Sequence, residues 1–334
     1  MIKNILFLLS TLHYIRFSKL KALGWVLLSF VLSRSVSVFE SHLKPLFVSI
    51  EPSDFCQLSC PECPVGMQRR RTGKKMDLPL FRSTIDAIKT HVFHVIFYFQ
   101  GEPLLHQSLP EMIQYAHKAG IFTSTSTNGQ LLSSVVAEKL VLSGLDKIII
   151  SIDGATQEVY EKYRIGGKLD RAIEGAKLLN YWKQKHHSLT PFIEIQTILF
   201  STNEHQIKAI KQLTKKLKAN RLVLKTAQLY NFENGNDLMP KQKKYSRYEK
   251  LDNGTYKLKG TLKNRCFRLW SGSVIGASGK VLPCCFDKNA THDFGNLSHQ
   301  DFQTAFQSSQ ASTFRNSILQ NRIQHEICRN CTSR

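Results

Sequence analysis

The sequence predicts an α/β fold in which six strands alternate with helices, a (β/α)6 arrangement. Two observations predict it. Short apolar runs with strand-like composition alternate with longer runs of helical periodicity over residues 46–226, and glycines follow several of the helical runs. Strands that alternate with helices form parallel sheets. A third observation, three closely spaced cysteines directly after the first strand, predicts a metal site at the end of that strand.

The six predicted strands are short and mostly rich in β-branched or aromatic residues. They cover residues 46–50, 94–99, 121–127, 146–152, 192–200 and 221–226. Ser108 and Glu111 have the spacing of a capping box at the start of one intervening helix, which Gly120 ends. Gly144 ends the next helix. Functional residues should therefore lie at the C-terminal ends of the strands, as in other barrels of this kind.

Residues 1–44 hold two apolar stretches, residues 5–12 and 23–32, separated by basic residues. Neither stretch has the roughly 20 apolar residues of a transmembrane helix, and no small-x-small cleavage site follows. We therefore expect an amphipathic helical appendage. Two roles stay open: attachment to an anionic membrane surface through Tyr14, Trp25 and Phe30 beside basic residues, or packing across the open side of the barrel.

The composition is that of a soluble globular protein with an excess of positive charge. Hydrophobic residues are 42% and charged residues 21%, which excludes a wholly disordered or polytopic membrane protein. The net charge of +21 favours an anionic partner: a phosphorylated substrate, nucleic acid or an acidic membrane surface. Nucleic acid is disfavoured, since no recognition motif or stacking platform is evident. A basic run at Arg69–Arg71, Lys74 and Lys75 is either a solvated face or a contact for an anionic substrate or redox partner.

The cysteine loop places Cys56, Cys60 and Cys63 at C-x3-C-x2-C spacing. A 4Fe-4S cluster needs about four ligands, so three thiolates leave one iron open to a cofactor or substrate. Pro61 and Pro64 stiffen the loop by fixing φ. The alternative is a structural zinc site, which this spacing fits poorly because zinc ligands usually come in pairs with a fourth ligand nearby.

This loop resembles that of the radical SAM enzymes, in which the triplet follows the first strand of a partial barrel and the open iron chelates S-adenosylmethionine. The resemblance covers residues 45–334. A second motif supports it, because four residues after the second predicted strand resemble the family's Gly-Gly-Glu-Pro motif, which holds the methionine amino group: Gln100, Gly101, Glu102 and Pro103. The sequence departs from the family at Gln100, where a glycine is usual, and at Glu62, where many relatives carry an aromatic residue against adenine.

The resemblance implies four further cofactor contacts. Ser151 and Arg164 are expected to reach the cofactor carboxylate, for which a guanidinium fork is well shaped. Asn128 and Gln196 are expected to contact ribose and substrate. The alternative for the first pair is a helix-capping serine and a solvated arginine.

The C-terminal cysteines resemble a SPASM domain, which binds auxiliary iron–sulfur clusters. The expected ligands of one auxiliary 4Fe-4S cluster are Cys266, Cys284, Cys328 and Cys331. Cys285 could replace Cys284, because neighbouring side chains of an extended segment point in opposite directions. A four-thiolate zinc site is the rival interpretation. Grouping of all eight cysteines at metal-ligand spacings predicts a reducing cytoplasm, with the protein cytoplasmic or peripheral to the inner face of the membrane.

The predicted organisation is a helical segment at 1–44, a radical SAM barrel at 45–230, a linker at 231–262 and a SPASM-like domain at 263–334. The resemblance implies that a reduced cluster cleaves S-adenosylmethionine to a 5′-deoxyadenosyl radical that abstracts a substrate hydrogen. The auxiliary cluster would relay an electron in an oxidative reaction, and the electron donor would be a flavodoxin or ferredoxin.

Two substrate classes and one non-enzymatic role remain. An anionic small or lipid-linked metabolite is preferred here, because 44 largely apolar residues are too few for the leader-binding domain that peptide maturases often carry. The alternative within the family is a peptide-modifying SPASM maturase. From another class, a non-enzymatic iron–sulfur electron carrier would have no use for Glu102 or an open iron.

Overall fold

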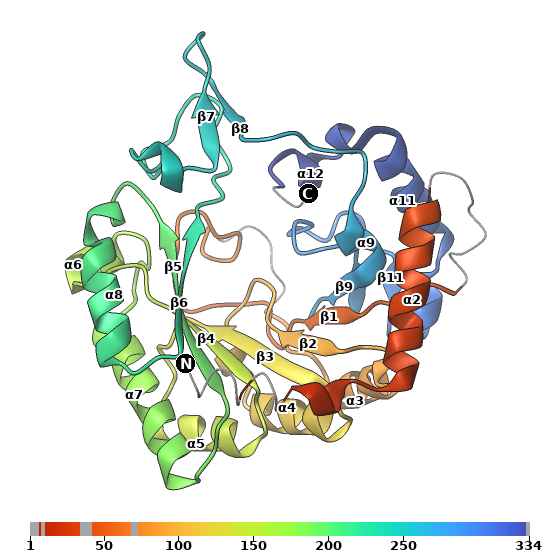
Figure 1. The fold of residues 1–334 in the computed structure, drawn as a ribbon, viewed down its shortest axis with the longest axis horizontal. Helices are drawn as coiled ribbons and strands as arrows, with labels where there is room; N and C mark the ends of the chain where they lie inside the picture. The colour runs from red at the N-terminus through yellow and green to blue at the C-terminus, as the bar shows by residue number, and fades with distance from the viewer. Residues whose placement is uncertain (1–6, 8–10, 34–41, 68–72, 332–334) are drawn as a thin grey trace.

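One nine-stranded sheet forms the centre of the molecule (Figure 1). The computed structural model describes residues 7, 11–33, 42–67 and 73–331. The strand order is β11-β10-β9-β1-β2-β3-β4-β5-β6, and neighbours from β1 to β6 run parallel. The curved sheet with helices along its outer side confirms the predicted α/β partial barrel.

The six predicted strands are all present, each within two residues of its expected bounds. They are β1 (Phe47–Ile50), β2 (His94–Phe97), β3 (Phe122–Thr127), β4 (Lys147–Ser151), β5 (Phe192–Leu199) and β6 (Arg221–Thr226). Their apolar side chains are buried in one continuous core, as expected for strands covered by helices. Strand β6 is the exception, since it is the edge of the sheet and is mostly half-buried or exposed.

The outer helices return the chain between consecutive strands. They are α3 (Leu78–Ile88), α4 (Leu109–Lys118), α5 (Ser134–Leu142), α6 (Gln157–Glu161), α7 (Leu169–Lys185) and α8 (Ile207–Lys216). The predicted capping box at α4 is wrong, although the helix begins where expected. The Ser108 side chain makes no capping hydrogen bond, and the Glu111 carboxylate pairs with Arg82 of α3 at 2.5 Å instead of reaching back along its own helix.

The segment expected to be a linker contains a hairpin, β7 (Tyr248–Lys250) and β8 (Tyr256–Leu258). The cysteine-rich region follows with α9 (Phe267–Ser271), β9 (Gly272–Ile275), β10 (Lys280–Leu282) and β11 (Gly295–Asn296). Strand β9 pairs in parallel with β1, so this region extends the barrel sheet. Gly272 allows the pairing, because a Cβ there would overlap the ring of Phe47. Helices α10 (Phe302–Phe306), α11 (Ser309–Asn321) and α12 (Glu326–Arg329) complete the described chain.

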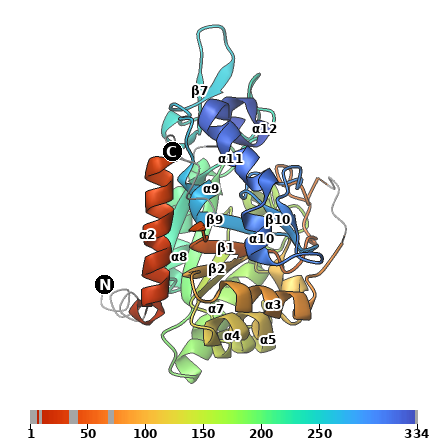
Figure 2. The same cartoon turned by 90° about the vertical axis from the view of Figure 1, so that its right-hand side faces the viewer.

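The N-terminal segment forms helix α2 (Phe17–Leu32), which lies along one side of the barrel (Figure 2). One face of α2 packs on the barrel: Val26 is fully buried, and the Phe30 ring meets the rings of Phe267 and Trp270 at centroid distances of 5.2 and 5.7 Å. The Lys19 ammonium is buried and donates to the carbonyl of Gly120 at 2.7 Å. Packing on the barrel, one of the two roles predicted for this segment, is thus realised on this face. Phe30 and Tyr14, which we expected at a membrane surface, lie against the barrel instead.

Residues before α2 reach the N-terminal ends of the barrel strands. The Tyr14 hydroxyl donates to the buried carboxylate of Asp146 at 2.7 Å, and the Phe7 ring lies 4.7 Å from that of Phe192. None of the helices in the described ranges is both long and apolar enough to cross a bilayer.

Candidate active site

The cysteine loop after β1 is a compact turn that turns its thiols toward the protein. Cys60 is buried, Cys56 and Cys63 are half-buried, and the Cys63 amide donates to the Cys60 carbonyl at 3.2 Å. Gly66 closes the loop, since a Cβ there would lie 2.5 Å from the Cys60 backbone. The short spacing therefore places the three cysteines on one compact loop.

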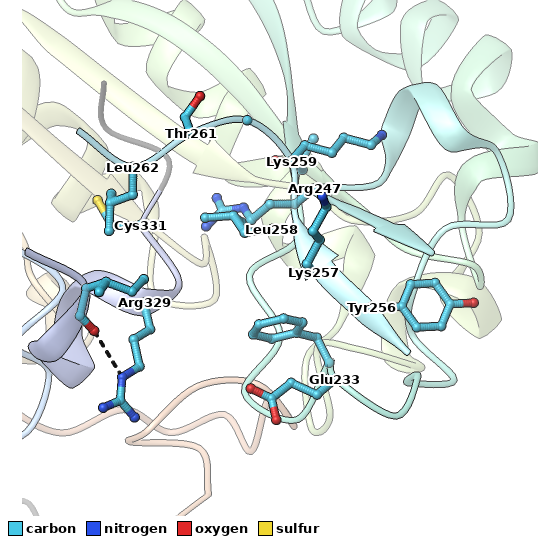
Figure 3. A pocket seen from close by; sticks show the side chains of 14 residues that line it. Glu233, Arg247, Tyr256, Lys257, Leu258, Lys259, Thr261, Leu262, Arg329 and Cys331 are labelled. Atoms are coloured by element: carbon cyan, nitrogen blue, oxygen red, sulfur yellow. Dashed lines mark hydrogen bonds between the residues drawn. The ribbon is translucent and has the colours of Figure 1, made fainter. Parts of the chain in front are cut away.

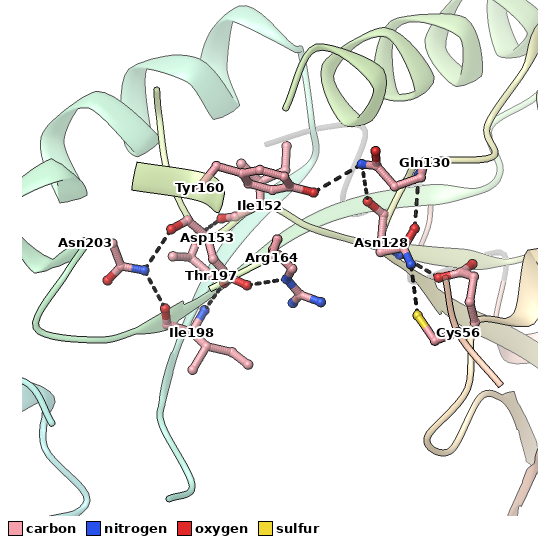
Figure 4. A network of polar contacts seen from close by, with 11 residues as sticks. Cys56, Asn128, Gln130, Ile152, Asp153, Tyr160, Arg164, Thr197, Ile198 and Asn203 are labelled. Carbon is pink, nitrogen blue, oxygen red and sulfur yellow. Dashed lines mark hydrogen bonds and ion pairs between the residues drawn. The ribbon is translucent and has the colours of Figure 1, made fainter. Parts of the chain in front are cut away.

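Asn128 joins the cysteine loop to the end of β3 (Figure 4). Its side-chain amide donates to the Cys56 sulfur at 3.4 Å, and its oxygen accepts from the Gln57 side chain at 3.2 Å. Burial raises the pKa of Cys56 to about 12, so the bare thiol is neutral and metal binding must stabilise the thiolate. The predicted cofactor contact Asn128 thus lies beside Cys56, a predicted cluster ligand.

Glu102 is a buried carboxylate beside the same loop. It accepts from the Thr127 hydroxyl at 2.7 Å, from the Asn128 amide at 2.9 Å and from the Leu104 amide at 3.1 Å. Burial raises the pKa of Glu102, while these hydrogen bonds lower it in part. The carboxylate is therefore fixed in orientation, as a group that receives a cationic amine must be.

The other residues of the Gln100-Gly101-Glu102-Pro103 motif hold Glu102 in place. The amides of Gln100 and Gly101 donate to the Glu51 carboxylate at 3.0 and 3.3 Å. A Cβ at Gly101 would overlap the Ser53 carbonyl, so close backbone approach explains this glycine. Pro103 begins the turn of 3-10 helix Pro103–Leu105. Gln100, the departure from the family motif, needs only its backbone for these contacts.

Arg164 lies beside Cys60 and is held by a carboxylate that the sequence analysis did not select. Its Nε donates to Asp153 at 2.6 Å, and Asp153 in turn accepts from the Ile198 amide at 2.6 Å. Burial lowers the pKa of Arg164, but Asp153 and the Cys60 thiol raise it by more, so the guanidinium stays charged. The carboxylate was identifiable in principle, because it follows β4 directly within the Ser151–Gly154 stretch.

Ser151 and Gln196 are partners across β4 and β5, at the same end of the sheet. Ser151 is buried and Gln196 half-buried. Figure 4 shows that Gln130 joins Asn128 to Tyr160, since its side chain donates to the Asn128 carbonyl at 3.3 Å and to the Tyr160 hydroxyl at 3.2 Å. The fold thus brings residues from the ends of β2, β3 and β4 to the cysteine loop.

Four of the five C-terminal cysteines line one small cavity. They are Cys266, Cys284, Cys328 and Cys331, and the rest of the lining is mostly apolar. The fifth, Cys285, lines a different cavity with Tyr98, which follows β2, and its sulfur accepts from Arg268 at 3.3 Å. The sulfur of Cys331 accepts from the buried Arg322 at 3.4 Å. The four-thiol set has the donor chemistry of an iron–sulfur or zinc site.

Neither cysteine group is arranged around a single ion. In the described part of the chain, no three His, Cys, Asp or Glu side chains converge closely enough to hold one metal ion. The donors themselves are sulfur-rich, with three thiols at one site and four at the other. That donor set fits iron–sulfur clusters at both positions.

The contacts of two residues escaped the sequence analysis. Glu62 accepts from the Tyr230 amide at 2.8 Å and from the Asn236 side chain at 3.2 Å, so it ties the cysteine loop to the segment after β6. The Lys288 ammonium lies 4.7 Å from the centre of the Tyr230 ring, and its charge interacts with Cys63 and Cys285. No local sequence signal marks either contact, because both join segments far apart in the chain.

A cavity of about 620 Å³ lies between the β7–β8 hairpin and the C-terminal segment (Figure 3). It is lined by Arg247, Lys257, Lys259 and Arg329, with Glu233 as its one carboxylate. Cys331 lines both this cavity and the four-cysteine cavity. The basic run predicted near the cysteine loop is only partly visible, since Arg69–Arg71 lie outside the described residues.

Comparisons with known proteins agree with this geometry. The sequence matches the radical SAM superfamily over residues 50–197 and the SPASM iron–sulfur cluster-binding domain over residues 266–332. It is 24% identical over 328 residues to the PqqA peptide cyclase of Bradyrhizobium diazoefficiens, and the aligned region covers 91% of this chain and 83% of that relative. It is 26% identical over 176 residues to the AdoMet-dependent heme synthase of Methanosarcina barkeri, and the aligned region covers 52% of this chain and 48% of that relative.

A solved structure shares the fold. Streptococcus suis SuiB bound to the precursor peptide SuiA superposes with a TM-score of 0.63 at 18% sequence identity, covering 87% of this chain and 71% of SuiB.

Proposed function

Because the chain belongs to the radical SAM superfamily and carries a SPASM iron–sulfur domain, we propose that it is an enzyme that modifies a peptide by radical chemistry. The two domains imply 4Fe-4S clusters and S-adenosylmethionine as cofactors. When bound, these supply a 5′-deoxyadenosyl radical that takes a hydrogen atom from the substrate, and an auxiliary cluster that accepts the electron left behind.

The main support for a peptide substrate is the nearly full-length similarity to a PqqA peptide cyclase. This similarity spans both the barrel and the cysteine-rich region. The similarity to a heme synthase covers only about half of each chain. The comparisons therefore support a peptide substrate better than the anionic small or lipid-linked metabolite that we preferred from the sequence.

The residues divide between two cysteine sites. Cys56, Cys60 and Cys63 would hold the first cluster, and the fixed carboxylate of Glu102 would accept the amino group of S-adenosylmethionine. Arg164 is charged and close to Cys60, which suits it to the cofactor carboxylate. Ser151 and Gln196 would complete the cofactor pocket from β4 and β5.

The auxiliary cluster would take the four cysteines that share a cavity. Cys284 lines that cavity as well as the neighbouring one, whereas Cys285 lines the neighbouring cavity and not the four-cysteine cavity, which supports Cys284 as the ligand. Full thiolate ligation leaves no open iron and suits electron transfer rather than substrate binding.

The basic cavity beside Cys331 has the size and charge for an acidic peptide segment. Its cations come from the hairpin and from the C-terminal region, and it also reaches Thr226 at the end of β6, an exposed edge strand. An extended peptide can hydrogen-bond to such an edge. An acidic stretch would also be attracted by four cations against one carboxylate.

The reaction we propose is an oxidation that removes two hydrogens from the peptide. One leaves as a hydrogen atom to the 5′-deoxyadenosyl radical, and the second leaves as a proton while its electron passes to the protein. The product is a cross-linked or desaturated peptide, lighter by two hydrogens.

Peptide pools from cells that lack the protein would test this proposal. Reconstituted protein with dithionite and S-adenosylmethionine should convert at least one peptide to a product lighter by two hydrogens, detected by mass spectrometry. If 5′-deoxyadenosine formation rises with small-molecule extracts and never with peptides, the peptide assignment is wrong while the radical SAM assignment stands.

A further inference from the structure

Helix α2 is apolar on both of its faces. The inner face buries Ala22 and Val26 against the barrel. The outer face exposes five large apolar side chains, which we name the α2 stripe: Phe17 (85% exposed), Leu20 (47%), Leu27 (46%), Leu28 (41%) and Val31 (66%). At 3.6 residues per turn these five fall within a band roughly 100° wide, opposite the buried face.

The α2 stripe is the main concentration of exposed apolar side chains on the described surface. Seven of the fourteen exposed large hydrophobic residues lie between residues 12 and 31, because Leu12 and Ile15 precede the stripe. The other seven are spread over residues 135–323. Scattered apolar residues are normal on a protein surface, whereas a contiguous patch marks an interaction site.

The charge around the stripe has a single sign. The first 39 residues contain no Asp or Glu, and they contain five Lys or Arg. Arg16 and Lys21 are exposed, and by helical periodicity Lys21 lies at the margin of the stripe. An apolar band with exposed cations near its margins is the pattern of helices that lie in the interface of an anionic bilayer.

We propose that the α2 stripe docks on an anionic lipid surface, with α2 parallel to the membrane and the barrel on its aqueous side. The apolar side chains would enter the boundary between headgroups and acyl chains, and Arg16 and Lys21 would lie near lipid phosphates. A second copy of the chain fits less well, because a symmetric contact through the stripe would bring the same cations together. This inference does not depend on the proposed peptide substrate.

Vesicle sedimentation of the full-length, reconstituted protein tests the docking. Wild type should sediment with vesicles of phosphatidylcholine and phosphatidylglycerol, less with phosphatidylcholine alone, and less at high salt. The double variant Leu27→Glu/Leu28→Glu should bind at least about tenfold more weakly. Phe17→Glu should also weaken binding, and because Phe17 is 85% exposed this variant should fold normally.

Leu142→Glu is the matched control, since Leu142 is 56% exposed on α5, away from α2. It should bind vesicles as wild type does, and all variants should still cleave S-adenosylmethionine. Two outcomes would overturn the docking: wild type that ignores anionic vesicles, or stripe variants that bind them like wild type. If the stripe variants instead convert a dimer to a monomer without any vesicle binding, the occupant is a second copy and the lipid proposal is wrong.

Discussion

The two cysteine sites of this protein are assembled in opposite ways. The first lies on one turn of eight residues, Cys56–Cys63, and is supported by polar contacts from Asn128 and Arg164. The second takes its thiols from segments as far apart as Cys266 and Cys331, around a largely apolar cavity. A local turn leaves room for an open iron, whereas a site closed by four distant thiols is suited to hold its cluster and pass electrons.

The largest effect should come from the first site. Cys60→Ala removes one of only three ligands, so it should abolish conversion of S-adenosylmethionine to 5′-deoxyadenosine with dithionite. Cys285→Ala is the matched control, because Cys285 lies outside both ligand sets, and it should retain this activity. Unchanged turnover in Cys60→Ala would contradict the assignment of the first cluster to Cys56, Cys60 and Cys63.

The next effect separates neighbouring cysteines at the second site. Cys284→Ser should lose about half of the bound iron and the peptide product, because it removes a ligand of a four-thiolate cluster. Cys285→Ser should keep its iron, since Cys285 lines the other cavity. The measurement is iron and sulfide content after anaerobic reconstitution. If Cys285→Ser loses iron and Cys284→Ser keeps it, Cys285 is the ligand instead of Cys284.

This pair of cysteines also shows where sequence reasoning stops. Spacing alone predicts the first triplet, because its geometry is fixed within eight residues. It could not choose between Cys284 and Cys285, because that choice depends on which of the two lines the cavity shared with Cys266, Cys328 and Cys331, and these come from distant segments. Composition and periodicity located β1–β6 well, since each strand is a local run of buried residues.

Contacts between segments distant in sequence account for the other site contacts that the sequence did not predict. Glu62 was noted only as a departure from an aromatic residue, and its bonds to Tyr230 and Asn236 span more than 160 positions. Asp153 was not among the predicted site residues, yet it accepts a hydrogen bond from Arg164 and holds it beside Cys60. For α2, helical periodicity could not assign both a packed face and an exposed apolar face to one helix.

A moderate effect is expected at Glu102, which should separate cofactor binding from cluster assembly. Glu102→Gln should weaken S-adenosylmethionine binding by about tenfold or more, because it removes the negative charge that we propose receives the cofactor amine. Iron content should stay at the wild-type value, since Glu102 is not a ligand. Isothermal titration and iron analysis of the same sample measure both. Loss of iron together with binding would show that Glu102 supports the cysteine loop instead.

The smallest effect concerns the charge around the second site. Arg322 donates to Cys331, and Arg268 lies near Cys284 and Cys285, so two cations should favour the reduced, more negative cluster. Arg322→Gln should therefore lower the auxiliary reduction potential by on the order of 50–100 mV. Redox titration followed by electron paramagnetic resonance measures the shift. A lower potential of the first cluster in the same variant, with the auxiliary potential unchanged, would contradict the assignment of Cys331.

The most direct test of the two-site account is the metal content of one triple variant. Anaerobically reconstituted wild type should hold about eight irons and eight sulfides per chain, in two 4Fe-4S clusters. Replacing Cys56, Cys60 and Cys63 by alanine should leave about four irons and remove all S-adenosylmethionine cleavage, because the second site is built from other segments. Stoichiometric zinc with about four irons in wild type, and no iron in the triple variant, would contradict an iron–sulfur cluster at the second site.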